Sequence, residues 1–182
     1  MVAANHSESN HGFADYFEFF ALPQQFRVDL QALDRAYLKI QQEVHPDKFV
    51  RSSDSEKRQS LQIATYANTA HQTLKHGIRR GIYLCGLKGF DPQLETNTSM
   101  PKEFLMQQMA LREEMDEARG DLAALTVIQE QANRELKKQM DEIESQFDTF
   151  DKPELAMLHL RAALFFERLL EELDHQMMVA ST

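Results

Sequence analysis

Apolar residues recur along this chain at spacings of three and four, which is the period of an α-helix. No window alternates apolar and polar residues for long enough to predict a strand, so the pattern predicts an all-α fold. Asp15 to Phe20 predicts a short aromatic helix, and Asp29 can cap a second helix that Pro46 ends. One face of this second helix carries the apolar stripe Leu30, Leu33, Tyr37, Ile40 and Val44.

A third helix is predicted from Glu56 to His76, because Ser53 and Glu56 have the spacing of a capping box. Its expected inner face consists of Leu61, Ala64, Ala67, Asn68, His71 and Leu74. A short fourth helix follows, at about residues 79–84. The second and third helices should form an antiparallel hairpin.

Three longer helices are predicted in the second half of the chain. Ser99 and Pro101 open the first, which runs to about Arg119, and Asp121 caps the next, which runs to about residue 147. Pro153 begins the last. Short turns between antiparallel helices favour a three-helix bundle over residues 101–182, and a longer coiled coil is the alternative.

The distribution of charge and glycine divides the chain into two modules. Residues 13–87 carry 10 Lys+Arg and 8 Asp+Glu, whereas residues 88–182 carry 10 and 20. Four of the six glycines lie between residues 77 and 89, and Pro92 follows them. We therefore expect a flexible N-terminus at residues 1–12, a first domain at 13–87, a linker at 88–100 and a second domain at 101–182.

Composition argues against several functional classes. A net charge of -9 argues against a nucleic-acid partner, which would need clustered cations. No stretch approaches the roughly 18 apolar residues of a membrane span, and residues 1–12 lack a signal-peptide pattern, so a cytoplasmic protein without a membrane partner is expected. The lone Cys85 can form neither an internal disulfide nor a cysteine-based zinc site. Phosphate-loop and acyl-transfer motifs are absent, so we expect no enzyme, cofactor or metal site.

The tripeptide His45-Pro46-Asp47 is the first candidate functional motif. It stands where the second helix ends, between the two helices of the predicted hairpin. Three cations are near it in the sequence: Lys39, Lys48 and Arg51. The alternative interpretation is a proline stop in which Asp47 is an ordinary turn residue.

The helix that begins near Pro101 has more apolar residues than one packed face needs. At about 100° per residue, its core stripe consists of Phe104, Leu111, Met115, Ala118 and Leu122. Leu105, Met106 and Met109 fall outside this stripe, beside Glu113 and Glu117. Such a surplus indicates either a partner surface or a helix that is buried on two sides.

Residues 13–87 resemble a J-domain, in which His-Pro-Asp lies between the second and third helices. Five segments are similar to the HscB family, the J-type co-chaperones of iron–sulfur cluster assembly. They are FADYFEFFAL (13–22), YLKIQQEVHPDKF (37–49), ANTAHQTLK (67–75), RGIYLCGLKGFD (80–91) and FLMQQMALREEMDEA (104–118). The resemblance covers nearly the whole chain beyond residue 12.

The resemblance implies that the first domain stimulates ATP hydrolysis by an HscA-type chaperone of the DnaK family. Asp47 would then pair with an arginine of the chaperone, Pro46 would fix the direction of the loop, and His45 would support both. The cations Lys39, Lys48 and Arg51 would meet an acidic surface of the chaperone and speed association.

The second domain would bind the iron–sulfur scaffold protein IscU. The resemblance assigns this role to Leu105, Met106, Met109, Glu113, Glu117 and a phenylalanine of the last helix, which we take as Phe165 rather than Phe166. Two alternatives stay open: a J-protein that serves a generalist DnaK chaperone with another client, and a helical adaptor with a fortuitous tripeptide. Lys39 stands among Gln41, Gln42 and Glu43, with no further cation beside it. This departure from general J-domains favours a dedicated chaperone over a generalist one.

Overall fold

The computed structural model describes residues 13–90 and 100–181, in which the regular elements are helices joined by turns and loops. No strand occurs in these two ranges, as the sequence predicts. The expected N-terminal segment 1–12 and residues 91–99 of the expected linker lie outside the described residues. The chain divides into two compact units, residues 1–80 and 81–182.

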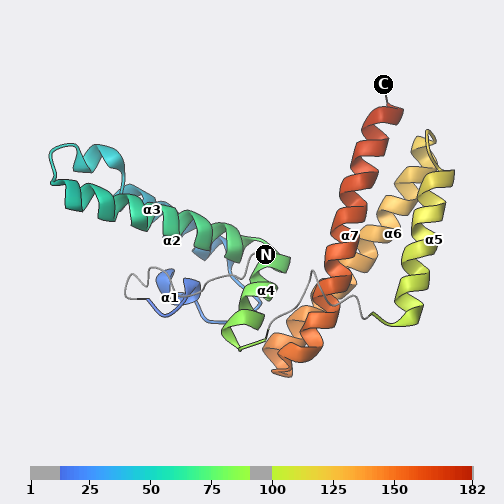
Figure 1. Cartoon of the computed structure of the whole chain (residues 1–182), viewed down its shortest axis with the longest axis horizontal. Helices are drawn as coiled ribbons and strands as arrows, with labels where there is room; N and C mark the ends of the chain where they lie inside the picture. The colour runs from blue at the N-terminus through green and yellow to red at the C-terminus, as the bar shows by residue number, and fades with distance from the viewer. Residues whose placement is uncertain (1–12, 91–99, 182) are drawn as a thin grey trace. The chain divides into compact units, whose positions relative to one another are not determined.

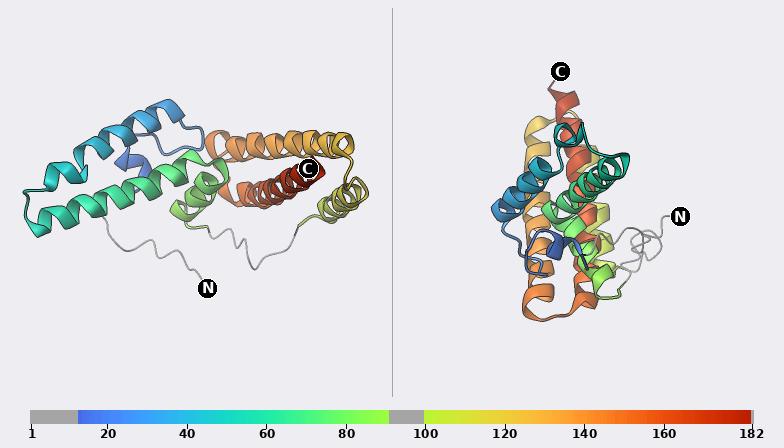
Figure 2. Two further views of the ribbon diagram at one scale, coloured as in Figure 1. Left: turned by 90° about the horizontal axis from the view of Figure 1, so that it is seen from above. Right: turned by 90° about the vertical axis from the view of Figure 1, so that its left-hand side faces the viewer.

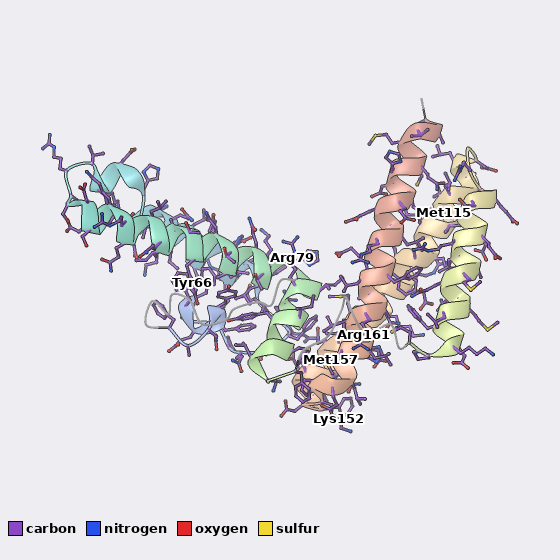
Figure 3. All side chains as sticks on the ribbon, viewed as in Figure 1. Tyr66, Arg79, Met115, Lys152, Met157 and Arg161 are labelled. Atoms are coloured by element: carbon purple, nitrogen blue, oxygen red, sulfur yellow. The ribbon has the colours of Figure 1, made fainter. Side chains whose placement is uncertain are left out.

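The first unit is built around an antiparallel hairpin of two helices, α2 (Leu30–Glu43) and α3 (Asp54–Lys75), which Figures 1 and 2 show side by side. The short helix α1 (Tyr16–Phe19) packs against α3, and Tyr66 of α3 meets its aromatic rings (Figure 3). Asp15 and Asp29 cap α1 and α2 through their carboxylates. Ser53 and Glu56 form a complete capping box, so α3 begins at Asp54, two residues before the predicted start.

A row of polar contacts joins α2 to α3 in addition to the buried apolar residues. The Asp34 carboxylate accepts hydrogen bonds from His71 Nε2 at 2.7 Å and from Lys75 Nζ at 3.1 Å. The Tyr37 ring stacks on His71, and its hydroxyl donates to Asn68 Oδ1 at 2.8 Å. These contacts fix which residues of the two helices lie opposite each other.

Helix α4 (Gly77–Leu87) is longer than predicted at both ends, and the division between the two units falls inside it, after Arg80. The sequence-based boundary at residue 87 is therefore seven residues later than the division found from contacts. The glycines that mark the boundary in the sequence do not break the helix, because Gly81 and Gly86 are both accommodated within α4.

The second unit contains three long helices: α5 (Lys102–Glu117), α6 (Leu122–Glu144) and α7 (Pro153–Ala180). Asp121 caps α6 as expected, and a turn of π-helix, η2 (Ser145–Thr149), ends it. Figures 1 and 2 show the three helices packed along one another, with Met115 of α5 inside the bundle (Figure 3). The core residues that the three helices share are Leu111, Met115, Leu125, Ile128, Ala132, Phe166, Leu169 and Leu173.

Three leucines and Asn68, which the sequence places on inner faces, are exposed instead. Leu61 is 67% exposed, Leu122 is 45% exposed and Leu30 is 44% exposed. Leu30 and Leu122 are the first residues of their helices, where the neighbouring helix gives little cover. Leu61 faces outward because Ser60 takes the inner position opposite the end of α2.

Candidate functional site

The His-Pro-Asp motif forms a turn of 3₁₀-helix at the end of α2. This turn, η1 (Pro46–Phe49), begins with proline at its first position, where no backbone donor is needed. His45 caps the turn, because its Nδ1 accepts a hydrogen bond from the Asp47 amide at 3.3 Å. The Lys48 amide donates to the His45 carbonyl at 2.9 Å. The motif is therefore a hydrogen-bonded turn.

A buried hydrogen bond ties the start of this turn to α3. The Ser60 hydroxyl donates to the carbonyl of Val44 at 2.7 Å, and both residues are buried. Val44 directly precedes the motif, so this bond fixes where the turn begins. The sequence does not identify Ser60 as an inner residue, because helical periodicity assigns the inner position to its apolar neighbour Leu61.

The charged groups of the motif are open to solvent. The Asp47 side chain is 88% exposed and lies 3.6 Å from His45 Nδ1. His45 Nδ1 can accept a hydrogen bond from the Asp47 amide only when this nitrogen carries no proton, whereas an ion pair with the Asp47 carboxylate requires that proton. The cap and the ion pair therefore exclude each other. The cap leaves the Asp47 carboxylate available to another molecule. The cations Lys39, Lys48 and Arg51 are exposed as well.

The surplus apolar residues of α5 lie at the surface. Leu105 is 41% exposed, Met106 is 61% exposed and Met109 is 63% exposed, while Leu111 and Met115 are buried in the bundle. Glu113 and Glu117 are exposed beside them. This arrangement contradicts a helix buried on two sides, because none of the three surplus residues is buried within the described part of the chain. We call Leu105, Met106, Met109 and Phe165 the α5 face.

Phe165 and its neighbour Phe166 differ in burial. Phe166 is fully buried, whereas Phe165 is half-buried and meets Phe104 edge-on, with ring centroids 5.8 Å apart. The Arg112 guanidinium carbon lies 5.8 Å from the centre of the Phe165 ring. Phe165 is therefore the phenylalanine of this pair that another molecule can reach. Sequence reasoning did not single out Arg112, because no helical pattern links it to α7.

The remaining candidate chemistry is sparse. Cys85 is buried, and desolvation raises the pKa of its thiol to about 12, which disfavours the reactive thiolate. Over residues 13–90 and 100–181, no three His, Cys, Asp or Glu side chains gather as ligands for a metal ion. No helix in the same ranges is long and apolar enough to cross a membrane.

Comparisons with known proteins place both units in one family. The family model described as "HSCB C-terminal oligomerisation domain" matches residues 100–174. The HscB homologue of Chromobacterium violaceum, a co-chaperone, is 42% identical over 137 residues, which cover 75% of this chain and 78% of that protein. The homologue of Aromatoleum aromaticum is 39% identical over 162 residues, covering 88% and 92%.

Solved structures agree with this assignment. The crystal structure of human HscB matches with a TM-score of 0.83 at 32% identity, covering 88% of this chain and 81% of the human chain. HscB from Vibrio cholerae matches with a TM-score of 0.79 at 29% identity, covering 88% and 96%.

A helical hairpin with His-Pro-Asp at the turn between its two helices, followed by a three-helix bundle, defines a J-type co-chaperone. The predicted fold, an N-terminal J-domain with a C-terminal bundle, is thereby confirmed. The identity to bacterial relatives and the coverage of their length make the assignment specific: this chain belongs to the HscB family of co-chaperones.

Proposed function

We propose that this chain stimulates ATP hydrolysis by an HscA-type DnaK-family chaperone and delivers the iron–sulfur scaffold protein IscU to it. The observation that carries the proposal is the occurrence of a His-Pro-Asp turn with exposed His45 and Asp47 side chains and of an exposed apolar face in one HscB-family chain. On this proposal the chain acts in the cytoplasm, has no catalytic activity of its own and needs no cofactor.

The chaperone-binding site comprises the turn and the cations around it. The exposed Asp47 carboxylate can pair with an arginine of the chaperone, and such charged hydrogen bonds are stronger than neutral ones. His45 and the Ser60–Val44 bond hold the turn in one conformation, which lowers the entropy lost on docking. Lys48 and Arg51 lie just after the motif, and Lys39 lies on α2. These cations would raise the rate of association with an acidic surface.

The scaffold-binding site comprises the α5 face with Glu113 and Glu117 at its rim. Burial of a large apolar side chain is worth roughly 1.5–3 kcal/mol, so three or four such residues can supply most of the binding free energy. The methionines suit a surface that must adapt to its partner. We propose that the domain at residues 13–87 stimulates the chaperone and that the domain at residues 101–182 binds the scaffold protein.

A single-carboxylate comparison tests the chaperone site. Asp47→Ala should abolish stimulation of the HscA-type ATPase, whereas Asp54→Ala should leave it unchanged. The two carboxylates are matched, since their side chains are 88% and 87% exposed and both stand at the start of a helix. Equal stimulation by the two variants would contradict the assignment. Replacing His45 and Pro46 as well should add little, because stimulation is already lost.

The same assay separates the competing functions. Purified HscA-type chaperone and generalist DnaK are each measured with and without IscU. Stimulation of the HscA-type chaperone that rises further with IscU supports the proposal. Stimulation of DnaK alone favours a generalist J-protein, and no stimulation of either favours a helical adaptor.

A binding titration tests the scaffold site. The triple variant Leu105→Ala, Met106→Ala, Met109→Ala should bind IscU about a hundredfold or more weakly, allowing for non-additivity. A matched triple variant truncates exposed apolar residues elsewhere in the bundle, Val127, Leu155 and Met178. This control should bind as the unaltered chain does. Equal binding by the two variants would place the scaffold site elsewhere.

A further inference from the structure

Arg112 is an exposed cation of α5 that lies next to Leu105 around the helix and contacts Phe165 of α7. Its guanidinium carbon stands 5.8 Å from the centre of the Phe165 ring, within the range of a cation–π contact. Among the described residues no carboxylate forms an ion pair with it. Asp116, one helical turn further on, is paired with Arg119 at 3.0 Å instead. The charge of Arg112 is therefore not neutralised within the described part of the chain.

Arg112 lies at the side of the α5 face that carries Leu105 and Phe165. At 100° per residue, Arg112 lies about 20° from Leu105, about 60° from Met109 and about 120° from Met106 around the helix. A long side chain on a helix leans toward the preceding turn, which here carries Met109. The contact with Phe165 then joins α5 to α7 across this surface.

The side-chain N–H donors of Arg112 have no hydrogen-bond partner among the described residues. Its guanidinium carries five such donors in one plane. Two of these donors can meet both oxygens of one carboxylate. A docked partner would also exclude water from Leu105 and Met109, which strengthens such a pair and makes an unpaired Arg112 costly.

We propose that Arg112 is a specificity residue of the α5 face, and that it pairs with a carboxylate which the docked scaffold protein carries inside its apolar contact surface. This inference rests on the proposed scaffold function. It assigns a charge pattern to the partner: one acidic group among the apolar residues that meet Leu105 and Phe165, with cations elsewhere to meet Glu113 and Glu117. A partner without this acidic group would leave Arg112 desolvated and unpaired, so the arginine rejects it.

The test uses the full chain and purified IscU. Arg112→Gln should weaken binding about tenfold, and Arg112→Lys should recover part of the loss, because a lysine keeps the charge but not the paired donors. The matched control is Arg134→Gln, an exposed arginine on α6 whose ion-pair partner is Glu130 at 3.9 Å. This control changes the net charge equally and should alter binding less than twofold. Thermal melting confirms that all variants remain folded.

A double-mutant cycle tests whether Arg112 recognises a carboxylate of IscU or only supports the Phe165 ring. Each surface Asp or Glu of IscU is changed in turn to the amide and titrated against the unaltered chain and against Arg112→Gln. One carboxylate should matter to the unaltered chain and no longer matter to the variant. If Arg112→Gln binds like Arg134→Gln, or if no carboxylate is coupled to Arg112, the inference is wrong.

Failure of the wider proposal gives a different result. If the unaltered chain does not bind IscU, or if the Leu105, Met106 and Met109 triple variant binds normally, the scaffold function itself is wrong, and this inference with it. Loss of binding in the triple variant together with no effect at Arg112 overturns only the role of Arg112.

Discussion

The hairpin of the first unit and the bundle of the second both combine buried apolar residues with polar contacts, but they arrange them differently. Between α2 and α3, polar side chains meet at several levels, from Asp34 with His71 to Ser60 with the carbonyl of Val44. The helices α5, α6 and α7 share a continuous apolar core centred on residues such as Phe166 and Leu169, and polar contacts such as Gln129 with Asp174 flank it. Polar pairs fix register, because each needs its own partner, whereas an apolar core supplies more of the free energy of folding.

This difference matches the kind of surface that each unit offers to a partner. The first unit presents a short charged turn, whose position depends on the register of the two helices that flank it. The second presents one side of a helix, which needs only a stable support on its other side. A helix with two apolar sides can be packed on one of them and still offer the other to a partner.

The largest predicted effect comes from the bundle core. Phe166→Ala should lower the free energy of unfolding of the second unit by about 3–5 kcal/mol, because the ring is fully buried. Phe165→Ala should cost about 1 kcal/mol, since that ring is only half-buried. Chemical denaturation followed by circular dichroism measures both. Equal losses would mean that Phe165 is a core residue and would remove it from the α5 face.

Much of this fold could be predicted because helical periodicity and capping residues are local signals. Asp29, Ser53 and Asp121 each cap the expected helix, and the buried positions Leu111 and Met115 follow from spacing. Errors arose where burial depends on the neighbouring helix. Periodicity alone does not say where α2 stops covering α3, so it places Leu61 inside, although Ser60 holds that position.

The second prediction concerns the polar attachment of the His-Pro-Asp turn. Ser60→Ala leaves the buried Val44 carbonyl without its partner and should cost about 1–3 kcal/mol. Stimulation of the chaperone ATPase should fall as well, because the start of the turn is no longer fixed. Thr65→Ala is the matched control, since its exposed hydroxyl donates within α3 to Leu61. If Ser60→Ala keeps full stimulation despite lower stability, the bond holds the helices but does not position the turn.

The candidate sites could be predicted only in part, for a related reason. The helical pattern of α5 alone predicts that Leu105, Met106 and Met109 lie outside its packed face, and their exposure agrees with this prediction. The contact between Arg112 and Phe165 joins two helices more than 50 residues apart in sequence, so no local pattern reveals it. The roles of both sites stay predictions until the titrations and ATPase assays are done.

The third prediction is a pH dependence in the hairpin. Hydrogen bonds from His71 and then Lys75 hold the pKa of the Asp34 carboxyl below its ordinary value of 3.8. A lowered pKa in the folded state stabilises the protein above the unfolded pKa, and this contribution is lost as the pH falls through the folded value. Asp34→Asn should therefore be less stable than the unaltered chain near neutral pH, and the two should converge in acid.

Urea denaturation at several pH values measures this difference. Asp141→Asn, which changes an exposed carboxylate on α6, serves as the control and should show no such convergence. A constant gap between Asp34→Asn and the unaltered chain from neutral pH down to about pH 2 would show that ionisation of Asp34 does not stabilise the hairpin.

The smallest predicted effect concerns the charged rim of the α5 face. Glu113 and Glu117 are exposed, so water and salt screen them even in a complex. Reversing both to lysine should slow association with IscU severalfold at low ionic strength and have little effect on dissociation. The reversal of Asp141 and Glu142, two exposed acids of α6, gives the same net charge and should do less.

The chaperone site should respond to salt more strongly than the scaffold site does. At the chaperone site, the proposed contacts are charged, because Asp47 and the cations Lys39, Lys48 and Arg51 make them. The α5 face is mainly apolar. Raising the salt concentration from about 0.05 to about 0.5 M shortens the screening length severalfold, which weakens exposed charge pairs but not apolar burial. Stopped-flow association and ATPase stimulation over this range compare the two sites in the same chain. An equal salt dependence at both sites would mean that charge, and not apolar area, dominates recognition at the α5 face as well.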